Sequence, residues 1–200
     1  MTPIATTERL DELYGAPVPA SLDKVVRRIT PTYRAWIGAA RFVVLGTVGP
    51  EGTDTSPRGD DGPVVHIADD TTLLLPDWMG NNRLDSLRNI VRDGRVSLMF
   101  MVPGCTNVVR VNGTAIVTED AAARARFDKS GRQPRSVIAV TVAEMYFQCA
   151  KALMRAGLWT AGDESATVPS AGQFLQEARS VPDAQAYDAA YPAYAAPRLW

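Results

Sequence analysis

The chain has 200 residues, of which 46% are hydrophobic and 22% charged, and its formal net charge is −1. These values are typical of an ordinary globular domain with its own core, and they disfavour nucleic-acid binding, which needs a concentrated basic patch. One histidine and two cysteines leave almost no material for a zinc site or a Ser-His-Asp triad, so we expect no metal centre.

The composition also bears on location. The chain contains neither a basic-then-apolar leader nor a run of about 20 apolar residues, so we expect no signal peptide and no membrane span. Two cysteines without a disulfide framework suit a reducing compartment, and we expect the cytoplasm.

The first 40 residues have helical patterns. Ser21 is a typical N-cap and predicts a helix over 22–29, with Val25, Val26 and Ile29 on one side. The pair Thr30-Pro31 predicts a second helix that runs to about residue 40. We expect both helices to cover the outside of a sheet.

The pattern becomes rich in β-formers from residue 41. Predicted strands cover 42–48, 53–56, 63–67, 71–75, 95–102, 107–118 and 136–142. The turn at 49–52 makes the first two strands a hairpin, and Pro57 argues against a regular central strand at that position. Gly113 marks a bulge or a close approach within its strand.

Further helices are predicted between and after the strands. Their ranges are 82–91, 121–129, 144–155 and 171–179. We expect the last twenty residues to form an extended or partner-wrapping tail.

The order of these elements indicates the fold class. The β segments follow one another without alternating helices, which argues against a doubly wound sheet. We therefore predict a mainly β fold, a six-stranded antiparallel split β-barrel with flanking helices. Residues 1–200 form a single domain in this prediction: a helical segment over 1–40, a barrel core over 41–145, and C-terminal helices with a tail over 146–200.

One stretch combines a strand end with a polar loop and a helix start. An apolar run ends at Pro76-Asp77, and Gly80-Asn81-Asn82-Arg83 leads into the next helix. Backbone N–H groups at a helix start and an arginine fork can hold an anion. We interpret the stretch as the phosphate end of a nucleotide-like cofactor site; the alternative is an Asn N-cap followed by a surface Arg.

A second candidate is Ser56-Pro57-Arg58-Gly59, where a hydroxyl, a turn and an Arg could contact phosphate or ring-edge oxygens. The alternative is a surface turn. In an antiparallel barrel both loops could converge, because the strands that carry them could lie near each other.

Other polar residues have less specific surroundings. Arg110 lies between β-branched residues of a predicted strand and either faces a ligand or lies on the barrel exterior. A hydrogen-bonded structural role is favoured over a catalytic role for His66, and no nearby base would activate Cys105 or Cys149.

Several of these segments together resemble a known family. The pieces are Ser56-Pro57-Arg58-Gly59-Asp60, Leu74-Leu75-Pro76-Asp77, Gly80-Asn81-Asn82-Arg83-Leu84, Pro103-Gly104, Arg110-Val111-Asn112-Gly113, Cys149-Ala150-Lys151-Ala152-Leu153 with Arg155, and Gly157-Leu158-Trp159. They span about residues 35–160 and are similar to the pyridoxamine 5′-phosphate oxidase-like flavoproteins with the FMN-binding split barrel. Within that superfamily the chain resembles a bacterial branch of predicted flavin-nucleotide-binding proteins.

The resemblance implies a homodimer with two FMN molecules at the subunit interface. Arg58 and Arg83 would reach the FMN phosphate, with Asn81 and Asn82 beside it. The flavin and ribityl chain would be lined by Ser56, Leu75, Pro76 and Asp77. Three further residues would approach from the same or the partner subunit: Arg110, Lys151 and Trp159.

Three departures narrow the function. The vitamin B6 oxidases carry a Ser-Arg-Lys triplet where this chain has Asn81-Asn82-Arg83, and their C-terminal Arg-x-His signature is absent. Both differences argue against oxidation of pyridoxamine phosphate. The bacterial branch often has a His where this chain has Gln148.

The resemblance therefore implies an FMN-dependent oxidoreductase that uses flavin N5 hydride chemistry on an unidentified small-molecule substrate. The alternatives are a deazaflavin (F420) reductase or a haem-binding split-barrel protein, and a flavin carrier or sensor without turnover.

Overall fold

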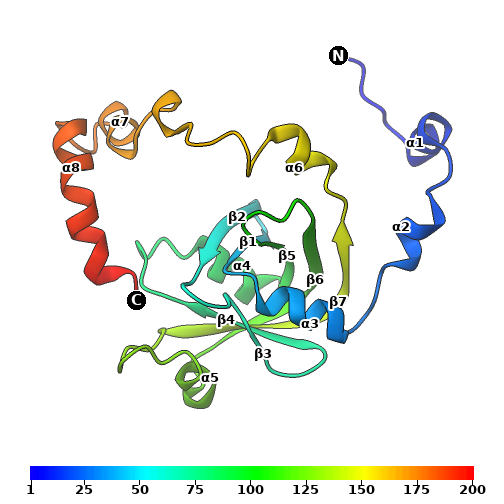
Figure 1. Cartoon of the computed structure of the whole chain (residues 1–200), viewed down its shortest axis with the longest axis horizontal. Helices are drawn as coiled ribbons and strands as arrows, with labels where there is room; N and C mark the ends of the chain where they lie inside the picture. The colour runs from blue at the N-terminus through cyan, green and yellow to red at the C-terminus, as the bar shows by residue number, and fades with distance from the viewer.

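An antiparallel sheet organises the chain, and the computed structural model describes all residues from 1 to 200 (Figure 1). Its strands are β1 (Phe42–Gly49), β2 (Gly52–Gly59), β3 (His66–Ile67), β4 (Thr72–Asp77), β5 (Arg95–Met101), β6 (Val108–Thr118) and β7 (Ser136–Gln148). The order across the sheet is β2-β1-β5-β6-β7-β4-β3, and every neighbouring pair is antiparallel. The predicted class, mainly β with flanking helices, is confirmed. The sheet has seven strands and not the predicted six, because the two-residue β3 pairs with β4.

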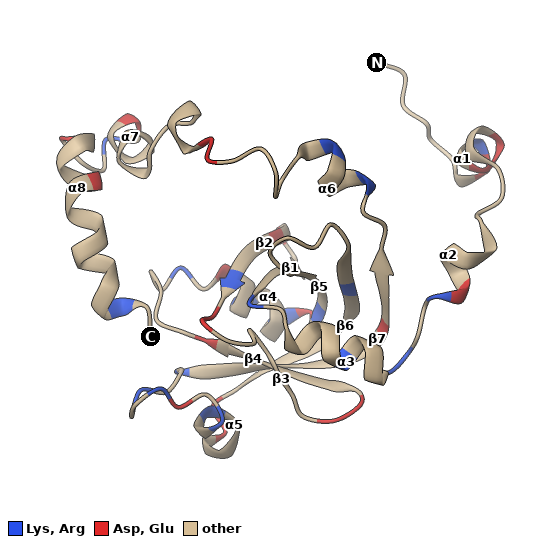
Figure 2. Cartoon of the chain, in the orientation of Figure 1, with Lys and Arg blue, Asp and Glu red and all other residues tan.

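Helices lie around this sheet and at both ends of the chain (Figure 1). They are α1 (Thr7–Tyr14), α2 (Pro19–Asp23), α3 (Pro31–Gly38), α4 (Asp85–Arg92), α5 (Ala121–Ala125), α6 (Lys151–Ala156), α7 (Ala171–Glu177) and α8 (Ala184–Ala195), with 3₁₀ turns η1 (Ser165–Thr167) and η2 (Ala196–Arg198). None of these helices has the length and apolarity that crossing a membrane requires. Basic and acidic segments lie interspersed along the chain (Figure 2), as the net charge of −1 suggests.

Alternating side chains build the core. In β1, Val43 and Leu45 are fully buried, and in β5 the same is true of Leu98 and Phe100. Because side chains of a strand alternate between the two faces, these residues point to one side of the sheet. Ile37 of α3 packs into the same core.

Pro57 lies within β2, which continues to Gly59 rather than ending at Ser56 as predicted. Pro lacks a backbone donor, but β2 is the edge strand of the sheet, so one side of it needs no partner. In the longer strand, Arg58 and Ser56 point to the same face, because they are two residues apart.

Gly113 forms the predicted bulge. The register between β6 and β7 shifts between Asn112 and Gly113. A Cβ atom at Gly113 would lie 2.0 Å from the Thr141 carbonyl oxygen, so only glycine allows this close approach of the two strands.

Two segments that were predicted to be helical are partly extended. The helix predicted over 22–29 ends at Asp23, and Val26 exchanges backbone hydrogen bonds of 2.9 and 2.7 Å with Met145. The helix predicted over 144–155 begins only at Lys151, because β7 stays paired with β6 as far as Gln148. Pairing between distant strands overrides the local helical pattern in both cases.

The prediction of an extended tail over the last twenty residues is also wrong, while its partner-wrapping alternative stays a prediction. Residues 184–195 form α8, and the side chain of Asp183 caps its first turn by accepting from Ala186 N at 3.1 Å. The alanines of this segment favour a helix once its start is capped. In Figure 1 the helix lies apart from the sheet, and the chain after it returns toward the loop that follows β4.

Candidate functional site

A cleft of 1390 Å³ lies between the ends of β2 and β4, the start of α4, and α8. Eight of the eleven predicted site residues line it: Ser56, Arg58, Leu75, Pro76, Asp77, Asn81, Asn82 and Arg83. The two polar loops identified in the sequence therefore converge, as expected.

The cleft forms where two distant parts of the sheet meet. β2 is one edge of the sheet and β4 is next to the other edge. Arg58 and Asp77 connect these strands, and Trp78 Nε1 donates to Asp60 Oδ2 at 3.1 Å beside them. The sheet therefore curls until its two ends are joined at the cleft.

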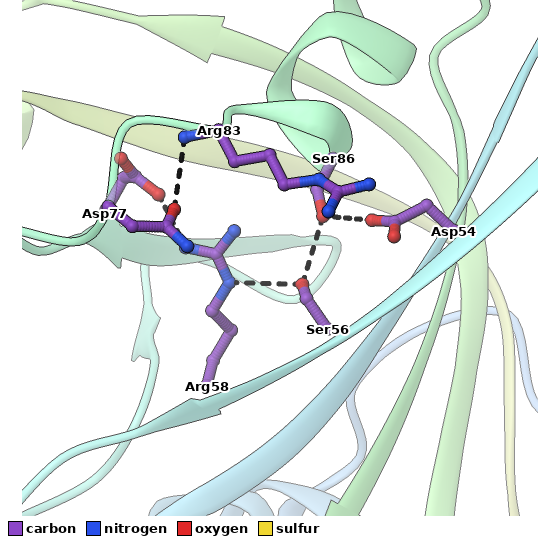
Figure 3. Close-up of polar contacts among 7 residues, drawn as sticks. Asp54, Ser56, Arg58, Asp77, Arg83 and Ser86 are labelled. Carbon is purple, nitrogen blue, oxygen red and sulfur yellow. Dashed lines mark hydrogen bonds and ion pairs between the residues drawn. The ribbon is translucent and has the colours of Figure 1, made fainter. Parts of the chain in front are cut away.

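Strand β2 presents three polar side chains at alternate positions, Asp54, Ser56 and Arg58. Arg58 Nε donates to Ser56 Oγ at 3.3 Å, and Ser86 Oγ donates to Asp54 Oδ2 at 2.5 Å. The two serine oxygens are 3.0 Å apart. Because Ser86 gives its only proton to Asp54, Ser56 is the donor between the serines, and the bonds run in one direction from Arg58 to Asp54 (Figure 3).

This chain of bonds fixes α4 against β2. Ser86 lies in the first turn of α4 and is only 4% exposed. Its hydroxyl satisfies two partners on β2, so the helix start is held at a set distance from the strand.

Arg58 is held from two directions. Its Nη1 lies 2.5 Å from Asp77 Oδ1, and the two side chains are 21% and 15% exposed. With Nε on Ser56, the guanidinium keeps its Nη2 without a protein acceptor. That group is free to donate to a ligand.

The loop before α4 has an unusual backbone. Asn82 and Leu84 have φ of 60° and 62°, and Asn81 Oδ1 accepts from Arg83 N at 3.0 Å. A left-handed Leu is strained, and such strain is concentrated at functional sites. No side chain caps α4, whose first backbone bond is from Arg88 N to Leu84 O. The N–H groups of its first turn therefore stay available for an anion.

Arg83 lies on the rim of the cleft, with its side chain 79% exposed. Its Nε donates to Asp85, and this hydrogen bond, with the charge of the carboxylate, raises the pKa of the Arg83 guanidinium above its usual value. Both Nη groups have no acceptor in the protein, so Arg83 can still donate two hydrogen bonds.

The structure adds cleft residues that the sequence analysis missed. They are Asp54 and Ser86 at the floor, Arg135 beside the loop, and Tyr187, Tyr191, Tyr194 and Arg198 of the C-terminal segment. The alternation along β2 was a usable signal for Asp54. No local pattern connects Arg135 or the C-terminal residues to the loop, since they meet it only through the fold.

Three predicted residues lie outside the cleft. Arg110 on β6 stacks on Tyr146, with 5.4 Å between its guanidinium carbon and the ring centroid. Trp159 Nε1 donates to Cys105 O at 2.8 Å, and Lys151 is exposed at the start of α6. Their role at a cofactor stays a prediction.

Comparisons with known proteins identify the family. Solved structures with a similar fold include a HupZ variant of Group A Streptococcus, which is 18% identical with a TM-score of 0.50 over 60% of this chain and 99% of HupZ. An FMN-binding protein of Syntrophomonas wolfei is 11% identical (TM-score 0.44; 58% of this chain, 83% of that one), and an FAD binding protein of Mycobacterium smegmatis is 13% identical (TM-score 0.42; 62% and 97%). A search of curated proteins finds no match. Residues 29–149 match the family model described as pyridoxamine 5′-phosphate oxidase, and since this match covers more than half of the chain, the chain belongs to that family.

Proposed function

We propose that this protein binds FMN in the cleft and acts as a flavin-dependent oxidoreductase on a small-molecule substrate. The observation that carries the proposal is the convergence of Arg58, Arg83 and the uncapped start of α4 in one cleft of a chain that belongs to this family.

The residues fit a phosphate monoester. A phosphate dianion is best held by guanidinium groups and by N–H groups at a helix start. Arg58 offers its free Nη2, Arg83 offers both Nη groups, and α4 offers its first-turn N–H groups. Asp77 and Asp85 orient the two guanidiniums without using all of their donors.

The rest of the cleft suits a flat cofactor. The buried Leu75 and Pro76 are among the residues around the cleft, together with Ser56. When bound, FMN would supply hydride transfer at its N5 atom, and the protein would bind and orient the reactants and exclude water. No protein side chain is required as an acid or base for this transfer.

We further propose a homodimer with the cofactor at its interface. Arg110, Lys151 and Trp159 do not line the cleft of their own chain, and in this proposal they reach the cleft of the partner. Exposed apolar side chains on β6 and β7, Ile116 at 65% and Phe147 at 44%, support such an interface. Light scattering should give twice the monomer mass; a monomer with bound FMN would contradict this proposal.

We also propose a cytoplasmic location. Cys105 and Cys149 are both free and exposed, and exposed thiols persist where they are kept reduced. A disulfide-linked species in freshly lysed, thiol-blocked cells would contradict it.

The test of the cofactor is a spectrum of the purified protein followed by FMN titration. Arg83→Ala should weaken FMN binding about tenfold or more, because a charge-assisted hydrogen bond contributes about 1.5–3 kcal/mol. Arg92→Ala is the control, since Arg92 lies in the last turn of the same helix, bonds Glu51 and lies outside the cleft. Riboflavin lacks the phosphate, so its affinity should not change in either variant.

The same titration separates the alternatives. Unchanged FMN affinity in Arg83→Ala would refute the assignment of this loop. A protein that binds F420 or haem in place of FMN would indicate the deazaflavin or haem alternatives. Tight FMN binding without reduction by NAD(P)H or by a substrate panel would indicate a carrier or sensor.

A further inference from the structure

We propose that residues 183–200, here called the C-terminal strap, form the substrate side of the cleft and select a planar aromatic anion. The inference rests on the proposed flavin function and adds a substrate class to it. Four observations carry it: the anchoring of the strap, a row of tyrosines, two cations without carboxylate partners, and the size of the cleft.

The end of the strap is anchored to the barrel. Trp200 packs edge-on against Trp78, with ring centroids 5.3 Å apart at 76°. Lys129 Nζ lies 3.5 Å from the Trp200 ring centroid, and Arg132 Nη1 donates to Pro197 O at 3.2 Å. The strap therefore has a defined position over the cleft.

The start of the strap packs against α7. Gly172 N of α7 donates to Asp188 Oδ1 at 2.8 Å. A Cβ atom at Gly172 would lie 2.3 Å from the Ala184 carbonyl oxygen, so α7 and α8 are in very close contact. The two helices therefore form one unit, and one face of α8 is turned to the cleft.

That face carries a row of aromatic rings. Tyr187, Tyr191 and Tyr194 follow one another at helical spacing and all line the cleft. Their ring centroids are 5.9 and 6.4 Å apart, and Tyr191 and Tyr194 are 49% and 59% exposed. Such rings offer stacking surface to a flat ligand.

Two cleft arginines lack an acidic partner. Arg58 and Arg83 are paired with aspartates, whereas Arg135 and Arg198 form no ion pair. Arg135 Nη1 contacts Asn82 Oδ1 of the loop before α4 at 3.4 Å, whereas Arg198 stacks over Tyr194 at 4.1 Å and donates from Nη1 to Tyr194 O at 2.7 Å. Arg198 is therefore a cation without a carboxylate partner within the aromatic row, which matches a ligand with an acidic group.

The cleft has room for this second ligand. Its 1390 Å³ exceeds the range of about 300–1,000 Å³ that is typical of one small-molecule ligand. The phosphate donors lie on the β2 and α4 side, and the strap lies across from them. A substrate that stacks on the flavin would therefore lie against the tyrosines.

The experiment titrates the FMN-loaded, full-length protein with 2-naphthoate and follows the flavin absorption bands. Cyclohexanecarboxylate tests the aromatic requirement, and 2-naphthamide tests the charge. We expect 2-naphthoate to bind about tenfold more tightly than either analogue.

Two variants assign the selectivity to the strap. Tyr191→Leu should weaken 2-naphthoate binding about fivefold, and Arg198→Gln should weaken 2-naphthoate but not 2-naphthamide. FMN affinity should stay unchanged in both. The matched control is Tyr14→Leu, because Tyr14 is an exposed helical tyrosine of α1 that does not line the cleft.

The outcomes are distinct. FMN binding without preference for 2-naphthoate, or with a preference that survives both variants, overturns this inference and leaves the proposed function standing. A loss of FMN affinity in the strap variants also overturns it, because the tyrosines would then hold the cofactor. A protein that binds no FMN overturns the proposed function and this inference together.

Discussion

Arg58 and Asp77 form an ion pair across the candidate site, with Nη1 of one 2.5 Å from Oδ1 of the other. The two residues lie on β2 and β4, strands that are separated by four others in the sheet. The pair therefore links the two ends of the curled sheet and at the same time orients a guanidinium toward the cleft.

This double role predicts that Asp77→Asn lowers both the stability of the fold and the affinity for FMN. Removing the carboxylate leaves the half-buried Arg58 without its counter-charge. The free energy of unfolding, measured in urea, should therefore fall by about 1–3 kcal/mol. FMN affinity should fall, because Arg58 loses the carboxylate that orients its guanidinium toward the phosphate. Riboflavin affinity, measured in parallel, should not fall. Equal losses for FMN and riboflavin would show that Asp77 acts on the ring and not on the phosphate.

Gly113→Ala tests the bulge between β6 and β7. The new Cβ would lie 2.0 Å from the Thr141 carbonyl oxygen, which is backbone and cannot rotate away. We expect a loss of about 3 kcal/mol or more in the free energy of unfolding, at the upper end of overpacking effects. Gly46→Ala in β1 is the control, since its Cβ would meet Ser97 O at 3.5 Å, an ordinary contact. Similar urea midpoints for the two variants would contradict the close approach.

His66 predicts a pH dependence of stability. Burial and the charge of Arg126 lower the pKa of His66 below its usual value, and Arg126 Nη1 lies 3.2 Å from the ring Nε2, which must accept and so be unprotonated. The unfolded chain, with a His pKa of about 6.5, takes up the proton more readily than the folded chain. The stability associated with His66 is therefore complete above about pH 6.5 and is lost as the pH falls toward the lower folded pKa.

Urea unfolding of the wild type and of His66→Gln at several pH values measures this effect. The carboxylates contribute equally to both proteins, so their difference isolates His66. The wild type should lose more stability than the variant between about pH 7.5 and pH 5. If the free energy of unfolding changes equally with pH in the two proteins, the contact of His66 with Arg126 does not persist in solution.

Local residues were sufficient to predict most strands and the two polar loops that line the cleft. The alternation in β1 and β5, the turn at residues 49–52 and the Gly-Asn-Asn-Arg segment are properties of neighbouring residues. Gly113 was also identifiable, because a glycine inside a strand of β-branched residues indicates a bulge. The family match over residues 29–149 includes the segments recognised between Ser56 and Gly113, and the segments over 150–159 lie beyond it.

Except in the C-terminal segment, the errors occurred where a distant segment decided the local structure. Val26 became extended because Met145 offers it two backbone hydrogen bonds, and β7 continued past Glu144 because β6 runs beside it. The strand length of β2 depended on being at an edge, where Pro57 is tolerated. None of these partners is visible within a short window of sequence.

The sequence by itself determined the fold class and the two polar loops that line the cleft, because periodicity, turns and helix starts depend on near neighbours. Only the tertiary structure decided that Ser86 and Asp54 complete the floor, that Arg135 faces Asn82, and that tyrosines of α8 line the other side of the cleft. The physical reason is that a binding site is defined by distances between chain segments, and those distances are set by strand pairing and packing across the whole sheet.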